Sequence, residues 1–217
     1  MKARVARHHV REEIQRRILS GESKPGERLS QQSLAKELGV AQGAVRESLL
    51  ELQWLGLVES VDHLGVFVSD LDASLICEAY RVREVLEGLA ARLACNQAGR
   101  ADIAGLRIMA DNIFKLAHEN KAEEMGSLDR NLHLRIIELS RNGVLLRLAE
   151  TYRVLGMTVR ASRDPQIIHE EHLQIIQAIE HNSADEAERI ARQHVAGARQ
   201  RIEDQAQQGK FVPKWVG

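Results

Sequence analysis

Acidic and histidine side chains in the second half of the chain have the types and spacing of a metal site. Asp129 and His133 stand four residues apart in a segment predicted to be helical, so their side chains share one helix face. Leu132 and Ile136 flank that face, which indicates that it points into a core. Because a carboxylate buried without a partner is costly, this placement favours a ligand for Asp129.

Two histidines on later predicted helices also lie on apolar faces. His172 is in phase with Ile176 and Ile179, and His194 is in phase with Ile190. Together with the acid–histidine pair, they form an oxygen-and-nitrogen donor set for a divalent cation in a helical bundle. The alternative is that each histidine is merely exposed or hydrogen-bonded. We accept that alternative for His8, His9, His63, His118, His169 and His181.

The composition predicts a mostly helical protein. Of 217 residues 44 % are hydrophobic but only 3 % aromatic, which suits one large or two small domains rich in helix. The net charge of −1 provides no global attraction to nucleic acid. No membrane span or secretory signal is evident, and we expect a cytoplasmic protein. Cys77 and Cys95 fall on one predicted helix, roughly 27 Å apart, so we expect two buried thiols.

Residues 5–69 predict three helices followed by a β-hairpin. The first helix spans 5–19, Ser30 caps the second, Gly39 ends it, and a third follows with an apolar stripe. The segments "GLVES" and "GVFVS" predict two strands around the turn "VDHL". This is the outline of a winged helix-turn-helix, in which one helix enters the major groove. The alternative is a structural three-helix domain.

Beyond residue 70 we expect only helices, which gives domains 1–70 and 71–217. Asp164 and Pro165 begin one helix, and the S-x-x-E pattern of Ser183 and Glu186 predicts a capping box for the last. The four helices before them are expected at about 74–98, 101–119, 121–141 and 144–162.

Positive charge is concentrated at the N-terminal end. Residues 1–28 hold eight basic and four acidic side chains, although residues 1–70 hold ten of each. We therefore expect phosphate contacts from the first helix and from the "KPGER" turn, which contains Arg28. Arg46, one turn into the third helix, is the expected groove contact, to a phosphate or a guanine edge.

Residues 10–69 resemble the N-terminal domain of GntR-family transcription regulators. The resemblance rests on "PGERL", "LAKELGV", "VRESL", "GLV" and a glycine in the hairpin. It implies a protein that binds double-stranded DNA through the third helix and the wing. The positions that we assign to DNA binding are Arg28, Gln32, Gln42, Gly43, Arg46, His63 and Gly65.

Two of these positions depart from the family pattern. Gln32 and Gln42 stand where relatives often have arginines that touch DNA, whereas Arg46 is kept. Glutamine can pair with adenine, whereas arginine prefers guanine. We therefore hypothesise that the operator differs from the usual family half-site at the base facing Gln42. Ala41 is a poor N-cap and Gly43 disfavours helix, so we expect a soft first turn until DNA orders it.

The second half resembles the FCD effector domain of the FadR subfamily. The matching segments are "YRVREVLEGLAARLA", "DRNLHLRIIELSRN" and "EEHLQIIQAIEHNSADEA", followed by His194. In that family an Asp, the His four residues later and two further His commonly bind a metal such as zinc or nickel. The matching positions here are Asp129, His133, His172 and His194.

We hypothesise that a small organic acid binds at this centre as effector. Four protein ligands leave coordination positions open, and Arg83 matches a recurrent arginine that would bind the acid. The alternative for Arg83 is a salt bridge to Glu84 or Glu87. We therefore expect a homodimeric repressor on a two-fold symmetric operator, controlled by this acid. Two other hypotheses are a sensor of the metal itself and a metallohydrolase. The hydrolase lacks an evident general base beside the ligands.

Overall fold

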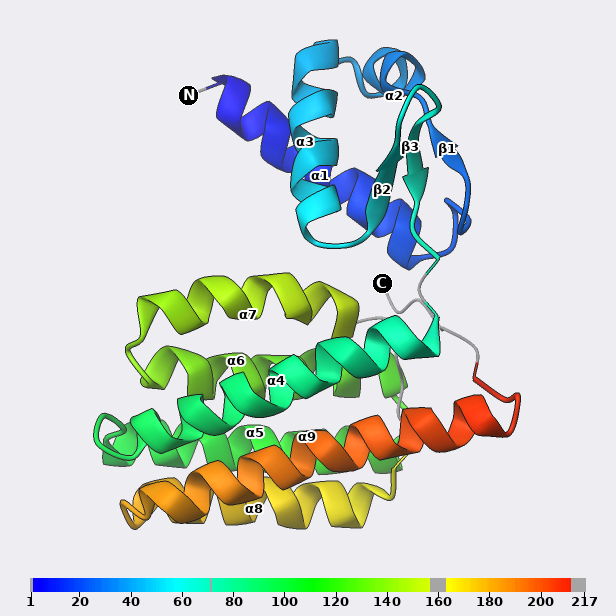
Figure 1. Ribbon diagram of the computed structural model, residues 1–217. Helices are drawn as coiled ribbons and strands as arrows, with labels where there is room; N and C mark the ends of the chain where they lie inside the picture. Colours follow the sequence, from blue (N-terminus) through cyan, green and yellow to red (C-terminus); the bar gives the residue numbers. More distant parts are fainter. Residues whose placement is uncertain (1, 71, 157–162, 212–217) are drawn as a thin grey trace. The chain divides into compact units, whose positions relative to one another are not determined.

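The chain divides into two compact units in the computed structural model, which describes residues 2–70, 72–156 and 163–211. The first unit ends at Asp72 and the second begins at Ala73. Helices dominate the described part of both units, and its strands form one small antiparallel sheet (Figure 1). The prediction of a winged helix-turn-helix followed by an all-helical bundle is confirmed.

The first unit contains three helices and three short strands. In chain order they are α1 (Lys2–Leu19), β1 (Arg28–Leu29), α2 (Gln31–Leu38), α3 (Gln42–Trp54), β2 (Val58–Val61) and β3 (Gly65–Val68). The predicted hairpin is present as β2 and β3. It is joined by β1, which the sequence analysis missed, in the order β1-β3-β2. A two-residue strand is too short to show an alternating pattern.

The core of this unit lies between α1 and α3. Val10, Ile14 and Ile18 recur every four residues on α1 and are buried, as are Val45 and Leu49 on α3. The two helices pack against each other. The Ser30 hydroxyl accepts a hydrogen bond from the backbone of α2, and the left-handed Gly39 (φ 64°) ends that helix, both as predicted.

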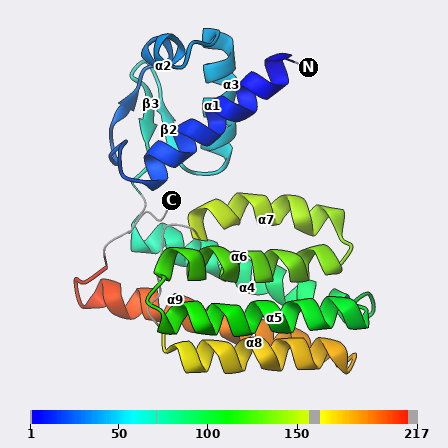
Figure 2. The same ribbon diagram turned by 180° about the vertical axis from the view of Figure 1, so that it is seen from behind.

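The second unit is a bundle of six helices within the described residues. They are α4 (Ala73–Ala94), α5 (Arg100–His118), α6 (Ala122–Leu139), α7 (Gly143–Gly156), α8 (Pro165–Glu180) and α9 (Ala184–Gln207). The most extensive contact is between α4 and α9, while α5 lies between α6 and α8 (Figure 2). Helix α4 also contacts α6, α7 and α8, so most of the bundle packs against one side of it.

Some helix ends differ from the prediction. Helix α4 ends at Ala94 rather than 98, so Cys95 lies just beyond it, and both cysteines are buried thiols as expected. The last residues of the predicted 144–162 helix, from 157 on, lie outside the described residues. Asp164 caps α8 through the backbone N–H of Gln166, at 2.9 Å.

The predicted capping box at Ser183 is wrong. Ser183 is the N-cap residue of α9, but its side chain makes no capping hydrogen bond. The Glu186 carboxylate instead accepts two hydrogen bonds from the Arg189 guanidinium, at 2.8 and 2.5 Å. The Ser183 backbone N–H, which a capping box would donate to Glu186, is already bonded to the carbonyl of Ala178 at 2.9 Å, so the box does not form.

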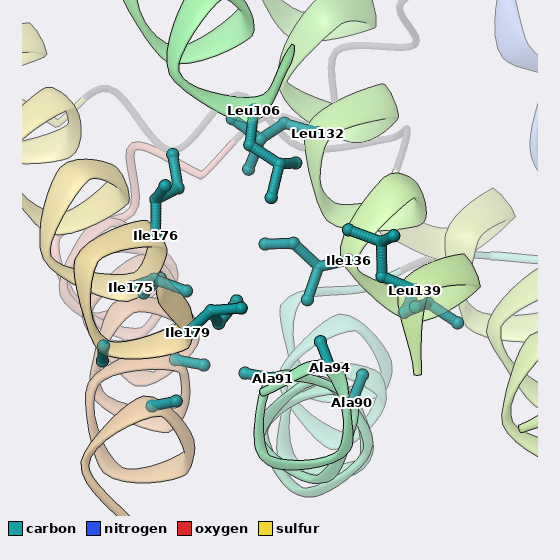
Figure 3. Close-up of a cluster of buried hydrophobic side chains, with 14 of the residues drawn as sticks. Ala90, Ala91, Ala94, Leu106, Leu132, Ile136, Leu139, Ile175, Ile176 and Ile179 are labelled. Carbon is teal, nitrogen blue, oxygen red and sulfur yellow. The ribbon is translucent and has the colours of Figure 1, made fainter. Parts of the chain in front are cut away.

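Small residues on α4 let neighbouring helices approach closely. Ala90, Ala91 and Ala94 are completely buried and face isoleucines of α8 and leucines of α5 and α6 (Figure 3). Near them on the same helix, a Cβ at Gly88 would lie 2.5 Å from Arg192 Cγ of α9. A larger residue at Gly88 would therefore displace the side chain of Arg192. None of the described helices is long and apolar enough to cross a membrane.

The start of α3 provides a test of local stability. Ala41 is the N-cap and offers no side-chain acceptor, and Gly43 is exposed, with open space where the methyl group of an alanine would lie. We predict that Ala41→Ser and Gly43→Ala each stabilise the first turn by about 0.5–1 kcal/mol. Amide hydrogen exchange should then slow several-fold at Arg46 and Glu47, whose N–H groups bond to first-turn carbonyls.

The matched control is Gly105→Ala on α5, where a methyl group also meets open space. It should leave exchange in α3 unchanged. Unaltered exchange at Arg46 and Glu47 in both α3 variants would show that the first turn is already fully formed.

Candidate metal centre

Three histidines from three helices meet inside the second unit. His133 comes from α6, His172 from α8 and His194 from α9, and all three are buried. One ring nitrogen of each lies within 4.8 Å of one ring nitrogen of each of the others. Their ring centroids are 4.7–5.4 Å apart. The apolar faces predicted from the sequence therefore do bring these rings together.

Asp129 lies at the edge of this histidine cluster. Its carboxylate oxygens are 3.4 Å from His172 Nε2 and 3.9 Å from His133 Nε2. The side chain is 32 % exposed, unlike the histidines, so it closes the cluster on the side nearer solvent. The four predicted residues are thus neighbours in space. That they bind a metal stays a prediction.

Two glutamates orient two of the rings. Glu171 Oε2 accepts a hydrogen bond from His194 Nδ1 at 2.7 Å, and Glu87 Oε2 lies 2.9 Å from His133 Nδ1. The His194 ring is therefore held through Nδ1, which leaves its Nε2 for another partner, whereas His133 Nδ1 and Glu87 Oε2 form a close charged contact without hydrogen-bond geometry. The arrangement at His194 is typical of metal-binding histidines, whose second nitrogen is held by an outer acceptor.

His172 is the unusual member of the cluster. It is fully buried, yet neither ring nitrogen has a hydrogen-bond partner within the described part of the chain. Buried polar groups are almost always paired, and leaving one unpaired costs about 1–3 kcal/mol. A divalent cation bound to Nε2 would satisfy this nitrogen. The donor set of three imidazoles and a carboxylate therefore fits a metal such as zinc or nickel.

The protonation states also suit metal binding. Burial lowers the pKa of His172 to about 3, and the neighbouring His194 contributes to the shift. Burial also lowers the pKa of His194, against the opposing hydrogen bond to Glu171. Both rings are therefore neutral near pH 7, which is the form that binds metals. For His133 burial acts in the same direction, but the Glu87 carboxylate outweighs it and raises the pKa.

Arg83 is linked to the histidine cluster by Glu87, which lies between Arg83 and His133. Its Nε donates a hydrogen bond to Glu87 Oε1 at 2.9 Å, and its guanidinium lies over the Tyr80 ring, 4.6 Å from the centroid. Of the two salt bridges considered from the sequence, the one to Glu87 is therefore present. This bond does not exclude a second partner for the guanidinium. A role for Arg83 in effector binding stays a prediction.

The sequence analysis missed three residues of the site. Glu87 was considered only as a partner of Arg83, and Glu171 and Arg163 were not considered. Arg163 donates to Glu171 Oε1 at 2.5 Å and so forms the outer end of a chain of contacts to His194. One signal was available: Glu87 stands within the apolar run "VLEGLAA", where an unpaired carboxylate is unfavourable.

The residues predicted to bind DNA are mostly on the surface of the first unit. Gln42 and Arg46 are exposed and four residues apart on α3, so they are neighbours on the helix surface, beside its buried stripe. In the wing, Gly65 has a φ of 115°, and a Cβ there would lie 3.1 Å from Arg28 Nε. The remaining positions are also exposed: Gln32, Gly43 and His63. None of this tests contact with DNA.

The fold defines a class of protein: a winged helix-turn-helix joined to an all-helical bundle. Comparison with known families agrees with this division. Residues 6–68 match the bacterial regulatory proteins of the gntR family, and residues 78–197 match the FCD domain. The chain belongs to the GntR family of transcriptional regulators, with a C-terminal FCD domain, as the sequence resemblance indicated.

Several transcription regulators are similar to this chain over most of their length. The Nta operon transcriptional regulator of Aminobacter aminovorans is 32 % identical, covering 79 % of this chain and 82 % of the relative. The probable D-xylose utilization operon repressor of Paenarthrobacter nicotinovorans is 29 % identical (86 % and 84 % covered). The E. coli McbR/YncC structure has the same fold, with a TM-score of 0.74 at 19 % identity (93 % and 98 % covered). The chain is thus a regulator and not an enzyme.

The unpaired His172 gives a stability test. We predict that His172→Leu leaves the metal-free protein as stable as the native chain or more stable, because two unpaired buried nitrogens are removed. Adding zinc at about 100 times its Kd should stabilise the native chain by about 2.7 kcal/mol and the variant by far less. The order of stability then reverses, which urea unfolding with chelator and with zinc would measure.

His169→Leu is the matched control on the same helix, because His169 contacts Asp111 Oδ1 at 2.9 Å outside the cluster. It should change stability equally with and without zinc. An equal response of His172→Leu and the native chain to zinc would contradict a metal at His172.

Proposed function

We propose that this regulator binds a divalent metal at the histidine cluster and that a small carboxylate bound there controls its affinity for an operator. One observation carries the proposal: fully buried His172 has two ring nitrogens without a partner among the described residues, beside two other histidines. Such a group is unfavourable in the protein alone and favourable with a cation. Membership of the GntR family, with a C-terminal FCD domain, does not depend on this observation.

The carboxylate is supported by what surrounds the cluster. Four protein ligands do not complete the coordination of an octahedral ion, and the metal when bound would supply a Lewis acid for a carboxylate oxygen. Arg83 provides a cation nearby, held in place by Glu87 and by the Tyr80 ring. A small acid that binds the metal at one end and Arg83 at the other is the ligand that these groups suit.

A homodimer on a two-fold operator is supported by an apolar surface on the second unit. Val82, Val85 and Leu89 follow one another on a single face of α4 and are 36–53 % exposed. Val144 and Leu148 are exposed on α7, which packs against α4. An exposed apolar face suits a two-fold dimer, and a dimer suits a palindromic operator.

Repression is the direction that we propose for the control. The similarity to the D-xylose repressor supports it. The Glc operon activator of E. coli, 26 % identical, is a relative with the opposite effect. Relatives with this fold thus act in either direction, and the similarity to the D-xylose repressor is what favours repression here.

Operator binding in three states tests the function. We predict that metal-loaded protein binds its operator, selected from a random DNA pool, and that small organic acids change the affinity by about 5–150-fold. Fluorescence anisotropy would compare metal-free protein, metal-loaded protein, and metal-loaded protein with each acid. His133→Ala should bind DNA without responding to any acid.

The same measurement separates the alternatives. A response to metal alone, unaffected by any acid, would indicate a metal sensor. A native chain that responds to neither metal nor acid would contradict the proposal.

The reading helix provides a second prediction. Gln42 is the first residue of α3 and is exposed beside Arg46. We predict that Gln42→Arg shifts the base selected at one position of each half-site from adenine toward guanine. A bidentate contact discriminates between bases by about 1–3 kcal/mol. Sequencing of DNA selected by the native chain and the variant would measure the shift.

Arg46→Ala is the comparison variant, and it should weaken binding without moving the preference at the Gln42 position. Selection of a guanine-centred half-site by the native chain would contradict the role given to Gln42.

A further inference from the structure

A second arginine lies behind the metal centre, on the side of His194. The Arg163 guanidinium donates one hydrogen bond to Glu171 Oε1 at 2.5 Å and another to the backbone carbonyl of His194 at 3.2 Å. Glu171 in turn accepts from His194 Nδ1 at 2.7 Å. The guanidinium is therefore linked to His194 in two ways. It bonds to the His194 backbone directly, and it bonds to the carboxylate that accepts from the His194 ring.

We propose that Arg163 is a positioning residue for metal binding, which fixes Glu171 so that His194 presents Nε2 to the other two histidines. This inference rests on the proposed function, because it assigns a role within the same centre. It adds a residue that touches none of the histidine rings and that neither the sequence pattern nor the family match singles out.

The need for such a residue follows from the exposure of Glu171. Its side chain is 24 % exposed, so a free carboxylate there could turn toward water and leave the imidazole. Arg163 is only 14 % exposed and holds one oxygen while the other accepts from His194. A carboxylate fixed in this way keeps the proton of His194 on Nδ1 and the lone pair on Nε2, as a metal ligand requires.

Gly197 makes room for this guanidinium. A Cβ built at Gly197 would lie 3.0 Å from both Arg163 Cζ and Nη2 and 3.3 Å from Nη1. A methyl group at this point meets only the end of a long side chain, so the arginine would move and the helix would not. Gly197→Ala is therefore expected to displace Arg163 while α9 keeps its structure, since alanine favours helix more than glycine.

The two ends of the cluster are built alike. Arg83, Glu87 and His133 repeat the order of guanidinium, carboxylate and imidazole, with contacts of 2.9 Å at each step. In both, the arginine balances the charge of the glutamate. Arg163 differs in that it also bonds to the backbone of the ligand residue.

The test uses Co²⁺ as probe and full-length protein. We expect Arg163→Ala and Gly197→Ala to weaken Co²⁺ binding about 10–100-fold, the usual effect of losing an outer partner of a ligand. In metal-free protein, ring ¹⁵N shifts should show His194 as a single Nδ1–H tautomer in the native chain and as a mixture in both variants. The tautomer is a readout that a loss of stability alone would not change.

Two controls match these variants. Arg107→Ala removes a similar arginine–glutamate pair outside the cluster. In this pair the Arg107 guanidinium donates a hydrogen bond of 2.6 Å to the Glu180 carboxylate on α8. Gly105→Ala adds a methyl group to a helix where nothing lies within 4 Å. Both should bind Co²⁺ and show the His194 tautomer as the native chain does.

The measurements separate a failure of the role given to Arg163 from a failure of the metal centre itself. If both Arg163→Ala and Gly197→Ala bind Co²⁺ as tightly as the native chain, with an unchanged His194 tautomer, Arg163 has no positioning role and the metal centre stands. If the native chain itself binds no Co²⁺, the metal centre fails and this proposal with it. If Arg163→Ala does not fold, Gly197→Ala and the tautomer measurement decide the question.

Discussion

An imidazole enclosed by the bundle, with no hydrogen-bond partner in the described part of the chain, constrains the whole second unit. His172 stands on the same face of α8 as Ile175, Ile176 and Ile179, and that face must be buried for the unit to have a core. The helix therefore carries a polar ring into the apolar interior. The loss of about 1–3 kcal/mol for each unpaired group is tolerable only because the surrounding core is extensive. A cation at this ring would recover the loss, so folding and ligand binding become one equilibrium.

The close packing of the helices follows from the same constraint. Rings from α6, α8 and α9 come within reach of one another only if the helices around α4 approach closely. Ala90, Ala91 and Ala94 allow this on one side, and Gly88 allows it against Arg192 on another. Because α4 also carries Glu87, the helix that sets the spacing is the one that orients His133. Packing and site geometry therefore depend on the same few residues.

Sequence reasoning reached as far as local periodicity allows. A spacing of four residues places Asp129 and His133 on one face, and the phase of neighbouring isoleucines places His172 inside, so the cluster could be anticipated. The partners of its rings could not. Glu171 directly precedes His172, and the helical period turns it about 100° away from that ring, toward α9. Which ring it then meets is set by the register between two helices, which no period in either helix records.

The same limit explains the errors at the ends of elements. A capping box is recognised from Ser183 and Glu186 alone, but the Ser183 N–H that would complete it is bonded to the carbonyl of Ala178, at the end of α8. Strand β1, only two residues long, exists only because β3 lies beside it.

Charge balance indicates how the centre would distinguish its ligands. The three carboxylates Asp129, Glu87 and Glu171 and the two guanidiniums of Arg83 and Arg163 leave one net negative charge when the histidines are neutral. A divalent cation changes this to one net positive charge inside a poorly hydrated bundle, where an uncompensated charge is unfavourable. A singly charged carboxylate restores neutrality, whereas a neutral sugar does not. In the proposed function the metal would thus create the site for the acid, and by linkage any effect of the acid on operator binding would be matched by an equal effect of the operator on the acid.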